Sequence, residues 1–157
     1  MDHREFFDRA GKIVIKPQNK PIKRRSSAYG IYIKDDLVLV IKPAWNNQWE
    51  LPGGGIEDGE TPEQAVKREF WEETRYKVQE LNPILVYKFH NYFYANDYDE
   101  YYDSDQFYYQ VLIADEADPI KFGSEETEKI DWIKISDLTE TNCRKASLEA
   151  IKKAVNS

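Results

Sequence analysis

The sequence predicts an α/β fold in which helices cover a mixed β-sheet. Short β-branched and aromatic segments alternate with two segments of helical periodicity, at residues 62–74 and 145–155. The chain has 157 residues, of which 41% are apolar and 14% aromatic, so it can form one domain with a core of its own. We find no internal repeat and no low-complexity tract.

The chain is expected to have two parts, a basic N-terminal arm at residues 1–26 and a single domain at residues 27–157. The arm carries eight basic and three acidic residues, and Pro17 and Pro21 break any long element within it. We interpret it as a solvated arm or a short strand laid over the domain. A contact to the phosphates of a nucleotide or of an RNA end is the less favoured alternative.

Strand-like segments alternate with turn signals along the domain. The predicted strands comprise residues 28–33, 37–42, 49–51, 84–94, 106–114 and 130–135. The first two form a hairpin, and the glycines at 53–55 form a flexible loop. The acidic residues 96–105 form the long tip of a second hairpin. Trp132 marks the middle of the last strand.

Both helices have clear signals in the sequence. Thr61 is a suitable N-cap for the first helix and Pro62 suits its first position. The second helix places Leu148, Ile151 and Val155 on one apolar face. We therefore expect the first helix to end at Thr74 and the second to close the chain.

Composition excludes several classes of protein. The longest aliphatic run, residues 37–41, is far shorter than a bilayer requires, and Met1–Glu5 lacks the apolar core of a signal peptide. Cys143 is the only cysteine, which excludes an intramolecular disulfide and a cysteine-rich zinc site. A net charge of −7 argues against non-specific nucleic-acid binding. These features indicate a cytoplasmic protein with no membrane partner.

Three acidic residues of the first helix share one face. Glu69, Glu72 and Glu73 are spaced i, i+3 and i+4, and like charges at this spacing destabilise an ordinary helix. Either solvent dilutes the repulsion or a cation gathers the carboxylates, whose oxygens suit hard ions such as Mg²⁺ or Mn²⁺. Arg68 stands four residues before Glu72 and can hold its carboxylate in place. The residues alone leave both interpretations open.

The segment from Gly54 to Tyr76 resembles the Nudix box, usually written G-x5-E-x7-R-E-U-x-E-E-x-G-U, in which U is a bulky apolar residue. The matching charged and glycine positions are Gly54, Glu60, Arg68, Glu69, Glu72 and Glu73. Arg75 departs from the box, which has a glycine there. Glycine after a helix often takes the left-handed conformation, which costs other residues about 1 kcal/mol.

The resemblance implies a Nudix-type α/β/α sandwich with a mixed β-sheet. It further implies a metal-dependent hydrolase that cleaves a pyrophosphate bond in a nucleoside diphosphate linked to another moiety. That class includes nucleoside triphosphates, dinucleoside polyphosphates and nucleotide sugars. The implied ligands of Mg²⁺ or Mn²⁺ are Glu69, Glu72, Glu73 and the carbonyl of Gly54, with Arg68 orienting the glutamates and Glu57 and Glu60 accessory. A homodimer is compatible with this class.

The resemblance leaves two positions for the general base. One is a glutamate of the box, Glu72 or Glu73. The other is the loop before the Trp132 strand, where Glu125 is favoured over Glu126 and Glu128. A solvated turn is the alternative interpretation of that loop.

Other signals are weaker. Tyr92 stands where dinucleoside-polyphosphate hydrolases of this family often have a tyrosine, but neighbouring tyrosines make a coincidence easy. His90 is expected to be a hydrogen-bonded sheet residue and Cys143 to be inert. Trp49 and Tyr29 could stack on a base or belong to the core. The alternative function is a non-catalytic Nudix domain that binds nucleotide or another protein.

Overall fold

The computed structural model describes residues 4–8, 10–44, 47–115 and 127–156. Its strands are β1 (Glu5–Phe7), β2 (Ile13–Ile15), β3 (Ile22–Ile31), β4 (Ile33–Lys34), β5 (Leu37–Pro43), β6 (Gly53–Gly55), β7 (Lys77–Ala95), β8 (Glu100–Asp115) and β9 (Thr127–Lys134). Its helices are α1 (Pro62–Thr74) and α2 (Lys145–Val155), and a 3₁₀ turn, η1, spans Ile135–Asp137. Neither helix of the described part has the length and apolar character of a membrane span.

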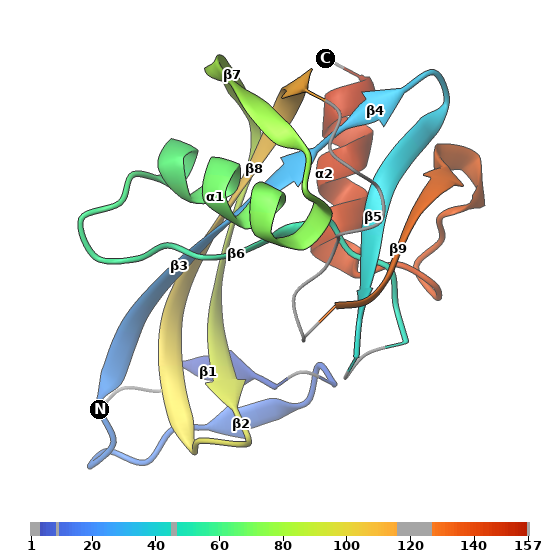
Figure 1. Cartoon of the computed structure of the whole chain (residues 1–157). Coiled ribbons are helices and arrows are strands. Elements are labelled where there is room, and N and C mark those ends of the chain that lie inside the picture. The colour runs from blue at the N-terminus through green and yellow to red at the C-terminus, as the bar shows by residue number, and fades with distance from the viewer. Residues whose placement is uncertain (1–3, 9, 45–46, 116–126, 157) are drawn as a thin grey trace.

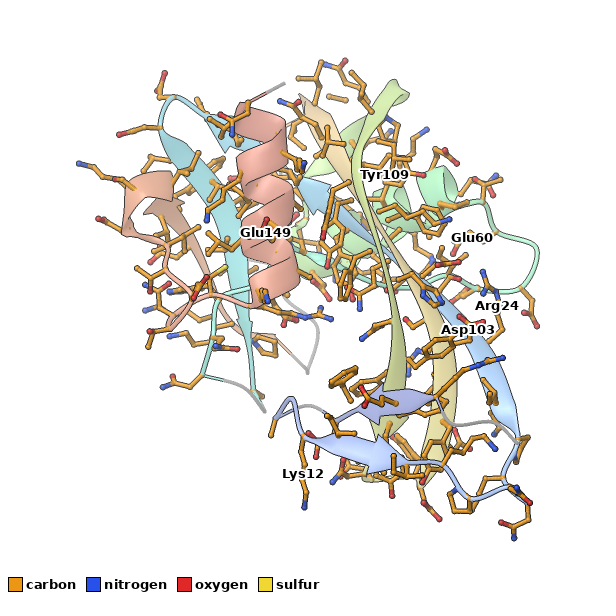
Figure 2. All side chains as sticks on the ribbon, turned by 180° about the vertical axis from the view of Figure 1, so that it is seen from behind. Lys12, Arg24, Glu60, Asp103, Tyr109 and Glu149 are labelled. Carbon is orange, nitrogen blue, oxygen red and sulfur yellow. The ribbon has the colours of Figure 1, made fainter. Side chains whose placement is uncertain are left out.

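Two β-sheets form the centre of the molecule (Figure 1). The larger has the strand order β2-β1-β7-β8-β3-β6, and the smaller has the order β4-β5-β9. β3 runs parallel to β8 and antiparallel to β6, so the larger sheet is mixed. α1 lies in front of the larger sheet in Figure 1, and α2 lies in front in the reverse view of Figure 2. The predicted α/β class, with helices on both sides of a mixed sheet, is confirmed.

The helices bury both faces of the sheets. Along β5, Val38 and Val40 belong to the apolar cluster around Ile151 of α2, whereas Leu39 belongs to the cluster around Phe70 of α1. Each of these five side chains is at most 1% exposed. A strand buried on both faces is a continuous apolar run, which explains why polar residues are absent from residues 37–41.

Both ends of α1 have the conformations that the sequence predicts. The Thr61 hydroxyl accepts a hydrogen bond from the Gln64 N–H at 3.1 Å, and the Gln64 side chain accepts one from the Thr61 N–H at 2.9 Å. Together with Pro62 at the first turn, this capping box fixes the helix start. At the other end, Arg75 has the left-handed conformation, with φ of 63°.

The second hairpin has a much shorter tip than expected. β7 and β8 continue to Ala95 and Glu100, so only residues 96–99 form the turn and most of the acidic stretch lies within β8. The reason lies in the N-terminal segment, because β3 runs beside β8 and brings bases to these acids. Figure 2 shows Arg24 beside Asp103, and their charged groups are 3.2 Å apart.

The part of the basic segment that leads into and begins β3 is therefore paired with acids rather than freely solvated. Its ion pairs include, among the described residues, Lys20 with Asp99, Lys23 with Glu100, and Arg24 with both Asp103 and Asp105. The expected boundary between residues 26 and 27 falls inside β3, whose residues pair continuously with β8 from Ile22 to Ile31. The charges that distinguished the arm in the sequence join it to the sheet.

Residues before β3 form a small hairpin against the end of β7 and β8. β1 pairs with β2 and also, at Phe7, with Phe93 of β7. Phe6 is fully buried, and its ring makes edge contacts with Tyr92 and Tyr101, at centroid distances of 5.4 and 5.1 Å. This is the strand laid over the domain that the sequence offered as one interpretation of the arm.

Two smaller expectations about local structure are wrong. The predicted strand at residues 49–51 is replaced by two isolated bridges, from Glu50 to Ile41 and from Trp49 to Cys143, because this segment is tied between β5 and the turn before α2. Val155 was expected on the buried face of α2, but it is 52% exposed, because that face is formed by Leu148, Ile151 and Ala154.

The left-handed conformation of Arg75 yields a stability prediction. Arg75→Gly removes a strain of about 1 kcal/mol. It also removes the contact between the guanidinium and the Trp71 ring, 5.3 Å away, which is worth about 0.5–1 kcal/mol. The free energy of unfolding of Arg75→Gly, measured by chemical denaturation, should therefore differ from that of the wild type by less than about 1 kcal/mol. Arg75→Ala loses the same contact but keeps the strain, so it should be about 1 kcal/mol less stable than Arg75→Gly. Equal stability of the two variants would contradict this account.

Candidate active site on helix α1

One face of α1 carries the candidate catalytic residues. The opposite face packs into the core through Ala65, Val66 and Phe70, all fully buried. This packing fixes the rotation of the helix and directs Arg68 and Glu69 toward β6 and the loop that precedes α1.

The Arg68 guanidinium is the centre of this face. It binds the Glu60 carboxylate with two hydrogen bonds, from Nε at 2.8 Å and from Nη2 at 3.0 Å. Nη2 also donates to the Gly55 carbonyl at 2.9 Å. Nη1 donates to Glu69 at 2.8 Å and to Glu72 at 3.3 Å. One side chain therefore connects the helix, the loop before it and strand β6.

The three consecutive glycines form strand β6, not the flexible loop that we expected. Gly54 pairs with Ala28 of β3. A Cβ on Gly53 would lie 2.2 Å from the Ala28 carbonyl oxygen, and one on Gly54 would lie 2.7 Å from the Glu69 carboxylate. Glycine is needed here because backbone and carboxylate approach too closely for a side chain.

Glu73 lies at the same junction. Its carboxylate accepts a hydrogen bond from the Gly53 N–H at 3.2 Å. The carboxylates of Glu69 and Glu73 are thus brought to two neighbouring residues of β6, Gly54 and Gly53. The sequence motif identified the acidic side chains, but the roles of the Gly53 N–H and the Gly55 carbonyl depend on β6 being a strand and could not be predicted from it.

The environments of these carboxylates differ. Hydrogen bonding to Arg68 lowers the pKa of Glu60, whereas burial raises the pKa of Glu69 in spite of its contact with Arg68. The carboxylates raise the pKa of Arg68 further above its ordinary value. Glu72 is half exposed, and Glu57 is 71% exposed with its carboxylate 3.8 Å from Arg68. The site thus has a partly buried charged centre and an open acidic rim.

The donor set fits a hard divalent cation in its chemistry. Glu69, Glu72 and Glu73 supply carboxylate oxygens, and the close approach of Gly54 to Glu69 forms a cradle that a Cβ would fill. In the arrangement that the structure shows, Arg68 lies between Glu69 and Glu72. Accordingly, among the described residues no three acidic, histidine or cysteine side chains are grouped closely enough to hold an ion.

Not every expected site residue can be located. Glu125 and Glu126 lie outside the described residues, as does the side chain of Glu128. The remaining predicted residues of the motif gather around Arg68 and β6, namely Gly54, Glu57, Glu60, Glu69, Glu72 and Glu73.

Comparison with known proteins places this arrangement in a family. The model of the NUDIX domain matches residues 23–154. The chain belongs to the NUDIX family. The matched range begins within the first residues of β3 and ends in the last turn of α2, so it includes both sheets except for the β1–β2 hairpin.

Curated relatives resemble part of this NUDIX domain. A MutT-like protein of Streptomyces ambofaciens is 46% identical over 63 residues, covering 40% of this chain and 41% of the relative. An RNA pyrophosphohydrolase of Aeromonas hydrophila is 44% identical over 48 residues, covering 31% of this chain and 27% of the relative. The matches thus span less than half the length of these relatives.

Solved structures share the NUDIX fold over most of the chain. A NUDIX hydrolase from Nitrosomonas europaea has a TM-score of 0.67 at 20% identity, covering 85% of this chain and 90% of that one. The MutT protein of Bacillus halodurans has a TM-score of 0.66 at 25% identity, covering 85% and 83%. The predicted α/β Nudix architecture is thereby confirmed.

The weaker signals of the sequence belong to other parts of the NUDIX domain. The Tyr92 ring packs against Phe6, and the His90 imidazole is hydrogen-bonded to Asp103, as expected for a sheet residue. Cys143 is buried, and burial raises the pKa of its thiol to about 11, which agrees with the expected inertness. Tyr29 stacks on Tyr108 in the sheet at a centroid distance of 4.9 Å.

The central position of Arg68 yields a second stability prediction. Arg68→Ala leaves Glu60 and Glu69 without their shared cation and should lower the free energy of unfolding by about 2–4 kcal/mol at neutral pH. Arg68→Lys keeps the charge but not the bidentate geometry, so its free energy of unfolding should lie between those of Arg68→Ala and the wild type.

The loss of stability in Arg68→Ala should become smaller as the pH falls. The folded pKa of Glu60 is lowered below its ordinary value of 4.5. Its stabilising interaction is therefore complete above that value and is lost as the pH falls through the folded pKa. Denaturant unfolding of the wild type and of Arg68→Ala should differ less at pH 3 than at pH 7. A difference that grows on acidification would contradict the assignment.

Proposed function

We propose that this NUDIX domain is a metal-dependent hydrolase that cleaves a pyrophosphate bond in a nucleoside diphosphate linked to another moiety. The observation that supports this most directly is the convergence of Glu69, Glu72 and Glu73 with strand β6 around Arg68. Three carboxylates held beside a strand of glycines provide hard oxygen ligands together with a backbone that a bulky group can approach closely.

Each residue of this face has a proposed role. Glu69, Glu72, Glu73 and the Gly54 carbonyl would hold Mg²⁺ or Mn²⁺. When bound, such an ion neutralises the diphosphate charge and acidifies water. Arg68 is a positioning residue, because its hydrogen bonds to Glu60 and the Gly55 carbonyl fix the guanidinium that orients Glu69 and Glu72. Glu57 and Glu60 are accessory.

The substrate class is inferred from the family and from the relatives' names. The relatives include an RNA pyrophosphohydrolase and a MutT-like protein, and one structural neighbour is a UDP-X diphosphatase. Each name is compatible with phosphoanhydride cleavage in a nucleotide-type substrate, which we propose for this chain in the cytoplasm. A panel of nucleoside triphosphates, nucleotide sugars, ADP-ribose, dinucleotides, dinucleoside polyphosphates and capped RNA, assayed by product identity with Mg²⁺ or Mn²⁺, tests the proposal.

A non-catalytic NUDIX domain that binds nucleotide or a protein is the second candidate. The observation that favours it is the position of the Arg68 guanidinium between Glu69 and Glu72, where it already neutralises both carboxylates. The same panel distinguishes the two functions. Turnover of any member supports the hydrolase, and binding without turnover supports the alternative.

The proposed metal site predicts how activity responds to chelation and to loss of one ligand. Activity should disappear in excess chelator and return with Mg²⁺ or Mn²⁺. Glu73→Gln keeps an oxygen that can accept the Gly53 N–H but loses the charge, so kcat should fall by at least about 10²-fold in a folded protein. Circular dichroism provides the folding control. Full turnover in chelator would refute the metal requirement, and an unchanged kcat would remove Glu73 from the site.

Adjacent glycines of β6 allow a matched comparison. Gly54→Ala places a Cβ 2.7 Å from the Glu69 carboxylate, whereas Gly55→Ala places one in open space and keeps the carbonyl that Arg68 binds. Displacement of a ligand by about 1 Å can cost 10²-fold in rate, so Gly54→Ala should lose most activity and Gly55→Ala little. Steady-state assays with the best substrate of the panel compare them. Equal losses in both variants would show that the spacing between Gly54 and Glu69 is irrelevant.

The general base remains a prediction. A loop carboxylate can deprotonate water near the diphosphate, and we expect Glu125 to have this role among the glutamates of its loop. Glu125→Gln, Glu126→Gln and Glu128→Gln should be assayed separately. Glu125→Gln should lower kcat by about 10²-fold or more with a small change in KM. If all three variants keep near-normal kcat, the base lies in α1 and Glu72 is the leading candidate.

A further inference from the structure

Trp49 forms a rigid aromatic surface near the end of β5. The backbone N–H of Trp49 donates to the Asn142 carbonyl at 2.8 Å, and its backbone carbonyl accepts from the Arg144 N–H at 2.8 Å. The residue is 9% exposed and belongs to the apolar cluster around α2. The indole is thus held in place by both its backbone and its packing.

Two lysines share this one indole. The Nζ atoms of Lys42 and Lys129 lie 4.5 and 5.6 Å from the centroid of the Trp49 ring. Lys42 of β5 and Lys129 of β9 stand directly opposite each other in the antiparallel pair. Like charges in this position destabilise a sheet, and cation–π contacts offset only part of that repulsion.

Neither ammonium group is neutralised within the described part of the chain. Lys42 and Lys129 make no ion pair and no side-chain hydrogen bond to a described residue. Of the acids of β9, the Glu128 side chain lies outside the described part, and the Asp131 carboxylate accepts the Trp132 N–H at 2.8 Å. By contrast, Lys20, just before β3, and Lys23 of β3 each pair with an acid. Within the described residues, the two lysines over Trp49 therefore carry positive charge that no acidic side chain neutralises, in a chain of net charge −7.

This cluster is separate from the acidic face of α1. Side chains alternate along β5, and Val38 and Val40 point toward α2 while Leu39 points toward α1. Lys42, two residues after Val40 and before the bulge at Pro43, lies on the α2 side. Trp49 belongs to the same side. An anion here would not compete with the carboxylates of Glu69 and its neighbours.

We propose that Lys42 and Lys129, positioned over Trp49, form an anion site that binds a phosphate group independently of a divalent cation. Two ammonium groups present up to six N–H donors to the oxygens of a phosphate. A bound phosphate would also relieve the repulsion between the lysines, which supplies a physical reason for their placement. The phosphate can come from a small phosphoanhydride or from an RNA backbone.

The test uses the full chain in excess chelator at low salt. Under these conditions the carboxylates of α1 have no divalent cation and repel anions, so phosphate binding reports on the lysine pair. The indole N–H resonance of Trp49 in ¹⁵N-labelled protein, assigned with Trp49→Phe, is followed during titration with inorganic phosphate and with pyrophosphate. We expect a saturable shift, and Lys42→Gln and Lys129→Gln should each weaken binding by at least about tenfold. Lys153→Gln, which changes an exposed lysine of α2, is the matched control and should leave the affinity unchanged.

Further measurements distinguish the two possible sources of the phosphate, and they separate failure of the anion site from failure of the proposed hydrolase function. A single-stranded RNA with a 5′-hydroxyl that competes as well as pyrophosphate identifies backbone phosphate as the ligand, and no competition identifies the small phosphoanhydride. Glu73→Gln should bind phosphate like the wild type even though hydrolysis is lost, so the two proposals can fail separately. The anion site is refuted by the absence of a saturable shift, or by wild-type affinity in both lysine variants with unchanged spectra elsewhere.

Discussion

The hydrogen bonds of one guanidinium hold the acidic face of α1 together. Arg68 joins Glu60 of the preceding loop, the Gly55 carbonyl of β6 and Glu69 of its own helix, at distances between 2.8 and 3.0 Å. Without a cation at this point, several carboxylates would face one another across a partly buried space. The planar fork of arginine satisfies them in fixed directions, which lysine cannot do.

The geometry around Arg68 depends on two further constraints. The capping box at Thr61 and the burial of Phe70 fix where α1 begins and how it is rotated. β6 pairs with β3. Because Gly54 has no Cβ, its backbone can approach the carboxylate of Glu69 more closely than any other residue would allow. The helix, the strand and the loop therefore position one another, and a change in any of them alters the distances between the carboxylates.

Charge is distributed over the fold in an ordered way. The basic N-terminal segment and the acidic stretch of β8 form ion pairs through Lys20, Lys23 and Arg24. These pairs are exposed on the basic side, so their contribution to stability is small and they chiefly select the register of β3 on β8. The charges of Lys42 and Lys129 have no such acidic partners among the described residues, which distinguishes that surface from the rest.

The sequence by itself determined the elements whose signals are local. The start of α1 at Pro62, the bounds of α2, the hairpin about residues 34–36 and the spacing of the glutamates all follow from propensity, capping and periodicity over a few residues. The left-handed position at Arg75 was also predictable, because a motif glycine marks a backbone conformation.

Only the tertiary structure decided the features that require residues far apart in the chain. Three glycines in sequence indicate flexibility, and they become a strand because β3 supplies hydrogen-bond partners and Glu69 leaves no room for a side chain. The acidic stretch indicates the long tip of a hairpin, and most of it becomes part of β8 because β3 brings basic residues beside it. In both cases the deciding interaction joins segments that the sequence separates, and local patterns carry no record of which segments will meet.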